Sequence, residues 1–162
     1  MAVTTEKSTQ ITNSEAKPRV PVAANDWSGK LRVARFDFTQ GAAAGDANST
    51  VDMVRLPAGS VRVYLAMSRI TTSAFGSSRT LDIGHTAYTG FDGATVAADE
   101  DDLDAAQSIS GAASYVPIGT VGGDETKLFE SHGDGVLIQA KCEGGTIPIA
   151  ATINGYFVYA VE

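Results

Sequence analysis

Six acidic residues lie within thirteen positions without an intervening lysine or arginine: Asp92, Asp99, Glu100, Asp101, Asp102 and Asp104. Carboxylate oxygens can coordinate Ca²⁺, and the candidate ligands in this run are Asp99, Asp101, Asp102 and Asp104. Calcium loops place acids at alternate positions and then require a glycine. Leu103 instead occupies the fifth position of a loop that begins at Asp99, and no glycine follows it. The pattern therefore favours a solvated loop with a short helix starting at Asp99, which caps it, over a calcium site.

The segment Ser131-His132-Gly133-Asp134 contains the residue types of a nucleophilic triad. Neighbours in sequence do not produce the geometry of a triad, and no Gly-x-Ser-x-Gly elbow occurs in the chain, so we interpret the segment as a turn. His85 lies on a predicted strand face, and only His132 and Cys142 could join it as transition-metal ligands, too few for such a site. We expect no catalytic residue, no resident metal and no cofactor.

Charge and cysteine content exclude further classes. The formal net charge is -7, and so acidic a chain offers few cations for binding nucleic acid through counterion release. Cys142 is the sole cysteine, so no disulfide can form within the chain. The opening residues have no apolar signal core, and no stretch is long enough to span a membrane. We expect a protein synthesised in a host cytoplasm, with neither nucleic acid nor membrane as partner.

Residues 1–28 differ in composition from the rest of the chain. They are polar, with neither the period of a strand nor that of a helix, which is typical of a flexible arm. Val20, Val22 and Trp27 are its candidate anchors, since a tryptophan is a common anchor at protein interfaces. Two interpretations remain open: a disordered tail, or an arm that becomes ordered against a neighbouring subunit through these three residues.

Residues 29–162 consist of short alternating segments separated by Gly, Asp, Ser and Thr turns. The strongest pattern is Ser60–Ile70, with Val61, Val63, Leu65 and Met67 on one face. The sequence also predicts a hairpin turn at 143–145, and a central or closing last strand with a break near 154–155. The predicted strands, about eight in all, are 30–39, 50–56, 60–70, 79–88, 112–118, 127–130, 135–142 and 146–161. This spacing predicts an all-β domain, an antiparallel β-sandwich of the jelly-roll type.

Four arginines lie on or beside three strands that we expect to be neighbours: Arg55, Arg62, Arg69 and Arg79. They could form a basic strip on the exposed face that contacts a partner, with Arg55 and Arg62 as its candidate contacts. The simpler alternative is pairing across strands with Asp52 and Asp82.

The middle of the chain resembles a known class of protein. Residues 54–63 (VRLPAGSVRV), 73–76 (SAFG), 79–88 (RTLDIGHTAY) and 92–99 (DGATVAAD), followed by Leu103 and Asp104, resemble small virion structural proteins of tailed bacteriophages. These are the auxiliary or decoration (cement) proteins of phage heads, and the match covers roughly residues 30–120. The resemblance implies a β-rich, often trimeric protein that sits on the lattice of the major capsid protein and braces it. It implies no catalytic residues.

Three functions follow as hypotheses. The first is a head decoration protein, located on the capsid surface of the virion. The second is a phage tail or head-fibre adhesin module that binds a host glycan through Tyr64, Tyr88, Phe91 or Tyr115, because carbohydrate modules present exposed aromatic rings. The third is a small cupin-type enzyme or metal module, which needs a cluster of His and carboxylate ligands.

Overall fold

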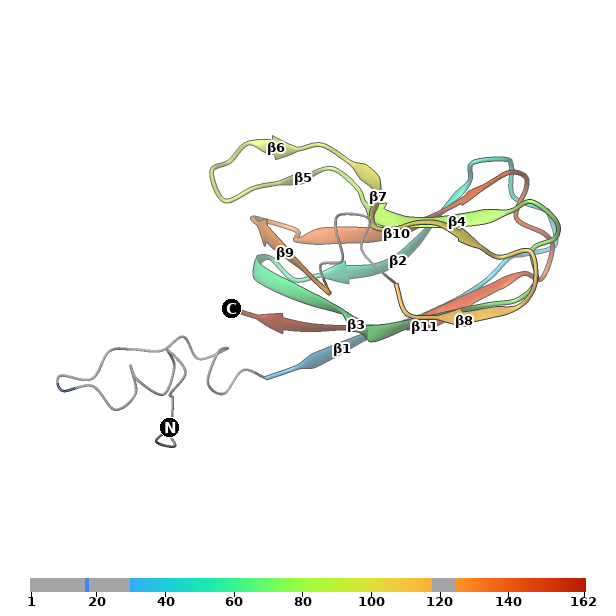
Figure 1. Cartoon of the computed structure of the whole chain (residues 1–162). Helices are drawn as coiled ribbons and strands as arrows, with labels where there is room; N and C mark the ends of the chain where they lie inside the picture. Colours follow the sequence, from blue (N-terminus) through green and yellow to red (C-terminus); the bar gives the residue numbers. More distant parts are fainter. Residues whose placement is uncertain (1–16, 18–29, 118–124) are drawn as a thin grey trace, which may run out of the picture.

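The computed structural model describes Lys17 and residues 30–117 and 125–162. In this part of the chain all regular structure is β, and two antiparallel sheets face one another as a sandwich (Figure 1). The predicted all-β sandwich is therefore confirmed. The predicted arm, residues 1–28, lies outside the described residues apart from Lys17, and so do its candidate anchors Val20, Val22 and Trp27.

Eleven strands occur among the described residues, against the eight or so that the sequence predicts. The first sheet has the order β1 (Arg32–Thr39), β11 (Thr152–Val161), β3 (Gly59–Thr72) and β8 (Ala113–Tyr115), and β9 (Thr126–Ser131) also pairs with β3. The second sheet has the order β2 (Thr50–Leu56), β10 (Val136–Glu143), β4 (Thr80–His85) and β7 (Asp99–Ser108). A small ribbon of β5 (Tyr88–Thr89) and β6 (Thr95–Val96) projects beyond one end of the sandwich (Figure 1).

Most connections cross from one sheet to the other, as in a double-sheet jelly roll. The chain alternates between sheets from β1 to β4, crosses again between β7 and β8, and crosses twice more from β9 to β11. The hairpin predicted at 143–145 is therefore wrong, because β10 and β11 belong to different sheets. Gly144 has a φ of 75°, and a Cβ there would lie 2.1 Å from the carbonyl oxygen of Ser78. The glycines thus allow the crossing chain to pack closely against residue 78.

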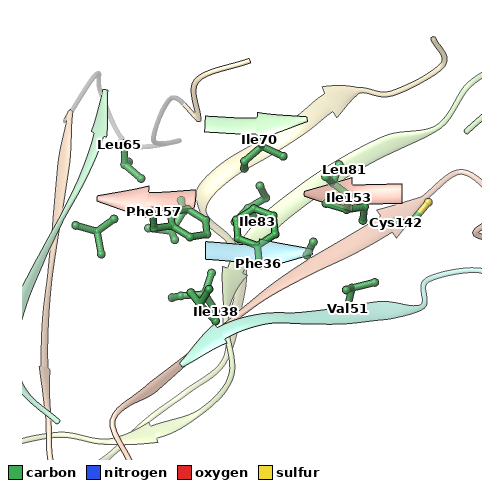
Figure 2. Close-up of a cluster of buried hydrophobic side chains, with 14 of the residues drawn as sticks. Phe36, Val51, Leu65, Ile70, Leu81, Ile83, Ile138, Cys142, Ile153 and Phe157 are labelled. Carbon is green, nitrogen blue, oxygen red and sulfur yellow. The ribbon is translucent and has the colours of Figure 1, made fainter. Parts of the chain in front are cut away.

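The core lies between the sheets and is built from the alternating apolar residues of both. Figure 2 shows Phe36, Ile70, Ile153 and Phe157 of the first sheet beside side chains of the second. The alternation predicted over residues 135–142 is confirmed, because the four apolar positions are all buried: Val136, Ile138, Ala140 and Cys142. β11 is a central strand, as predicted, but the break expected at 154–155 does not occur.

The alternation predicted for β3 fails at one point. Met67 is 50% exposed, whereas Ser68 is 2% exposed, because β3 bulges between its pairs with Val158 and Tyr156. The Ser68 hydroxyl donates a hydrogen bond to the carbonyl oxygen of Tyr64 (2.8 Å) and accepts one from the backbone N–H of Val158 (3.0 Å). A buried hydroxyl therefore replaces ladder hydrogen bonds that the bulge removes.

We expect Ser68→Ala to lower the free energy of unfolding by about 1–3 kcal/mol, because it leaves the buried N–H of Val158 without its acceptor. Chemical denaturation measures the change. Ser77→Ala is the matched control, since Ser77 is exposed in a turn. Equal stability of the two variants would show that the hydroxyl does not support the bulge.

The helix predicted from Asp99 is wrong: the acidic run forms the edge strand β7. Pairing with β4 overrides the local signals for a helix start, as tertiary context does for short segments. The pairing is irregular, with register shifts on both sides of Ile83. Asp82 accepts a hydrogen bond from the backbone N–H of Ala106 (2.6 Å), whose φ is 52°. β7 also lies directly over Gly84, where a Cβ would be 1.9 Å from the carbonyl oxygen of Asp99.

Candidate functional site

A buried charged cluster joins the two sheets at one end of the sandwich. His85 from β4, Asp102 from β7 and Lys127 from β9 meet there. The Nε2 atom of His85 lies 3.4 Å from Oδ2 of Asp102, and the Lys127 ammonium contacts Oδ1 of the same carboxylate. The His85 ring also packs edge-on against Tyr88 and Phe129, with ring centroids 5.2 and 5.5 Å away. The cluster is thus enclosed by aromatic rings on one side.

The geometry favours the doubly protonated form of His85. Its Nδ1 lies 2.9 Å from the carbonyl oxygen of Thr86, which can only accept, and its Nε2 faces a carboxylate. Burial by itself lowers the pKa of His85, but Asp102, the carbonyl of Thr86 and the charge of Asp99 outweigh it and raise the pKa above 6.5. Burial raises the pKa of Asp102, but His85 and Lys127 lower it overall. We interpret the cluster as a structural clamp between sheets.

The four candidate calcium ligands do not form one site. Asp99 and Asp101 are exposed, Asp102 belongs to the cluster with His85, and Asp104 is 5% exposed. Among the described residues no group of three or more His, Cys, Asp or Glu side chains could hold a metal ion. The irregular pairing of β7 with β4 thus leaves the four carboxylates in different surroundings.

The side chains of Ser131, His132 and Asp134 do not form a catalytic triad. Ser131 ends β9 and is buried, whereas His132 is exposed and its ring lies 5.6 Å from that of Phe91. Asp134 lies in the turn before β10, and its carbonyl oxygen accepts a hydrogen bond from Arg55 (3.4 Å).

Within the part of the chain that the structure describes, no helix is long and apolar enough to cross a membrane.

The basic strip predicted from four arginines does not form. Arg55 lies on β2 of the second sheet, whereas Arg62 and Arg69 lie on β3 of the first, so they belong to opposite layers. The alternative pairing is also wrong. Asp52 accepts a hydrogen bond from Gln139 and Asp82 one from Ala106, while Arg62 pairs with Glu162 (2.6 Å). The roles of Arg55 and Arg62 as partner contacts stay predictions.

A different pair of arginines comes together on the outer face of the first sheet. Arg35 of β1 and Arg69 of β3 are the direct cross-strand neighbours of Tyr156 on the central strand β11. The next cross-strand row consists of Asp37, Asn154 and Thr71. Together these side chains line an open hollow of about 540 Å³.

Each arginine of the hollow is positioned by a neighbour. The guanidinium carbon of Arg35 lies 5.9 Å from the centre of the Tyr156 ring, a cation–π distance. Nε of Arg69 donates to the hydroxyl of Ser114 on β8 (3.0 Å), which also bonds Thr71 (3.1 Å). The sequence pattern indicates Arg69 as a candidate but not Arg35 or Tyr156, because only the register of three strands brings these residues together.

Exposed apolar residues gather at the projecting ribbon. Phe91 is 47% exposed and Val96 36% exposed, and with Tyr88 and Leu128 they line a second hollow of about 370 Å³. Two other aromatic candidates for a glycan surface are less exposed than Phe91. Tyr88 and Tyr115 are half-buried and pack against the core. Burial raises the pKa of Tyr115 far above its usual value, with smaller contributions from nearby carboxylates.

The fold belongs to the class of double-sheet jelly rolls. No family model matches the chain, and no curated protein matches its sequence. A chain from the solved structure of the cyanophage Pam1 capsid asymmetric unit is similar, with a TM-score of 0.56 and 10% identity over 92% of this chain and 96% of that one. A chain from infectious bursal disease virus, Gt strain, has a TM-score of 0.45 and 12% identity over 84% of this chain and 34% of that one. At these identities the first likeness establishes the fold.

Proposed function

We propose that this chain is a virion structural protein, a decoration protein that binds the assembled head lattice of a tailed phage and stabilises it without catalysis. The observation that supports the proposal best is the likeness to a chain of a cyanophage capsid asymmetric unit, which extends over nearly the whole of both chains. The resemblance of residues 54–104 to phage head proteins points in the same direction. The protein would act as a homo-oligomer, a trimer, on the capsid surface.

Stabilisation would follow from mass action. A protein that binds the assembled lattice, and not its dissociated subunits, shifts the equilibrium toward the assembled head. The strength of this effect depends on the concentration of free protein relative to its dissociation constant. Catalytic residues are not required for such a role, whereas a rigid body with several contact surfaces is.

The direct test mixes the purified protein with phage heads assembled without it. We expect saturable co-sedimentation with expanded heads and a rise in the temperature at which the heads dissociate. A glycan array probes the adhesin hypothesis in parallel. Specific glycan binding together with no binding to heads would overturn the proposal and favour the adhesin.

Deletion of residues 1–28 tests the role that we propose for the arm. If Val20, Val22 and Trp27 anchor the arm to the lattice, the truncated protein should bind heads at least about tenfold more weakly, since a buried tryptophan is a typical hot spot. Its thermal unfolding midpoint should stay unchanged. Trp27→Ala should reproduce much of the loss, and Thr12→Ala is the control. Head binding at full strength by the truncated protein would remove the arm from the proposal.

A further inference from the structure

The hollow on the outer face of the first sheet has a net positive charge, because its lining contains two arginines, Arg35 and Arg69, and one carboxylate, Asp37. Arg35 and Arg69 are both exposed, and among the described residues no carboxylate forms an ion pair with either of them. Strands in a sheet are about 4.8 Å apart, so two strand spacings place the two backbones roughly 10 Å apart, with Tyr156 between them. This spacing suits two carboxylates on one extended segment better than a single small anion.

The arrangement of Arg35 favours a carboxylate over a sugar ring. Its guanidinium lies over the face of Tyr156, so this aromatic face is already in contact with the protein and is not free for a sugar. A guanidinium at a cation–π distance from a ring still has N–H donors for a ligand, in the fork that matches a carboxylate. Asn154 and Thr71 add an amide and a hydroxyl at the side of the hollow.

Suitable carboxylates lie on the opposite sheet of the same chain. No lysine or arginine occurs from Thr80 to Thr126, a span that contains the acidic run. β7 is the edge strand of the second sheet, and its first three residues, Asp99, Glu100 and Asp101, are exposed. Glu100 pairs with Lys141, whose contacts with Glu100 and Glu143 raise its pKa. The monomer therefore carries a basic hollow on one sheet and an acidic edge on the other.

We propose that the hollow formed by Arg35, Tyr156 and Arg69 binds the acidic edge strand β7 of a second copy of this chain, in a head-to-tail contact. Such a contact uses two different surfaces of each copy, so it continues from copy to copy until rotation closes a ring. The inference deepens the proposed function, because it names the surfaces of the proposed homo-oligomer. Charge complementarity of this kind sets orientation and speeds association.

The test measures self-association of the purified full chain by sedimentation velocity, without any capsid present. We expect wild-type protein to associate at low ionic strength and to dissociate as salt increases, because the contacting charges become screened. The double variant R35E/R69E should associate at least about tenfold more weakly. The neutral variant R35Q/R69Q should show a smaller loss, and circular dichroism checks that both retain the fold.

Charge exchange makes the test specific. D99K/E100K should also fail to associate alone, yet a mixture of D99K/E100K with R35E/R69E should associate, since each hollow then meets an edge of opposite charge. The control K30E/R32E makes the same change in charge at exposed positions outside the hollow and should behave as wild type.

Three results would overturn the inference: a monomeric wild-type protein at low salt, full association of R35E/R69E, or no rescue on mixing. Binding of an acidic saccharide by wild type that R35E/R69E abolishes, without self-association, would reassign the hollow to a glycan. Head binding is measured separately. Loss of self-association with head binding intact rejects only the contact between copies, whereas failure to bind heads by a protein that self-associates rejects only the decoration function.

Discussion

Phe157→Ala is expected to lower the free energy of unfolding by about 3–5 kcal/mol, the usual range when a large aromatic side chain is removed from a core. Phe157 is completely buried on the central strand β11, and its ring centre lies 5.6 Å from that of Phe36 (Figure 2). Truncation removes contacts with both sheets and leaves a cavity between them. Urea denaturation of the purified protein measures the loss.

The matched control is Phe91→Ala, which deletes the same group from a position that is 47% exposed on the projecting ribbon. Its effect on stability should stay within about 0.5 kcal/mol, as for most surface substitutions. If the two variants lost equal stability, the sandwich core would not be the main source of stability. If Phe91→Ala weakened head binding instead, the ribbon would be a lattice contact.

Asp102→Ala is expected to lower the free energy of unfolding by about 3 kcal/mol near pH 5, because it leaves His85 buried without its counter-ion. Lys127 contributes less to this loss, since its side chain is 38% exposed and can be solvated. The side chains of His85 and Asp102 are only 5% and 6% exposed. Breaking a pair that is buried on both sides is more damaging than breaking one at the surface.

The same variant has a predictable pH dependence. The pKa of His85 is raised in the folded protein, so its stabilising effect is complete below 6.5 and is lost as the pH rises through the raised value. The pKa of Asp102 is lowered, so its effect is present above 3.8 and is lost as the pH falls through the lowered value. The pair therefore contributes most between these two limits.

Unfolding free energies at about pH 5 and about pH 8 test this dependence. The difference between wild type and Asp102→Ala should be smaller at the higher pH, because the stabilisation from a histidine with a raised pKa is lost as the pH rises. Asp46→Ala, at an exposed loop position, is the control and should show no such change. A deficit that is the same at both pH values would show that His85 is not charged in the folded protein.

Much of the fold could be predicted from local pattern. The alternation of Val136, Ile138, Ala140 and Cys142 indicated a strand with one buried face, and the structure buries all four. The same reasoning failed at Met67 and at Asp99. At Met67 a bulge reverses the alternation, and at Asp99 pairing with β4 forms a strand where local signals favour a helix. Bulges and edge pairing depend on the neighbouring strand, which a single segment does not specify.

The same difference between local pattern and long-range pairing applies to the candidate sites. The all-β class and the positions of most strands can be predicted from the sequence, because a period of two residues and turn chemistry are local properties. By contrast, the cluster of His85, Asp102 and Lys127 forms only through the pairing of distant strands. The same holds for the position of Tyr156 between Arg35 and Arg69, and for the placement of Arg55 and Arg62 in opposite sheets. Sheet assignment and register arise from long-range pairing, and a shift of one residue reverses every side chain, so local pattern cannot specify which groups converge.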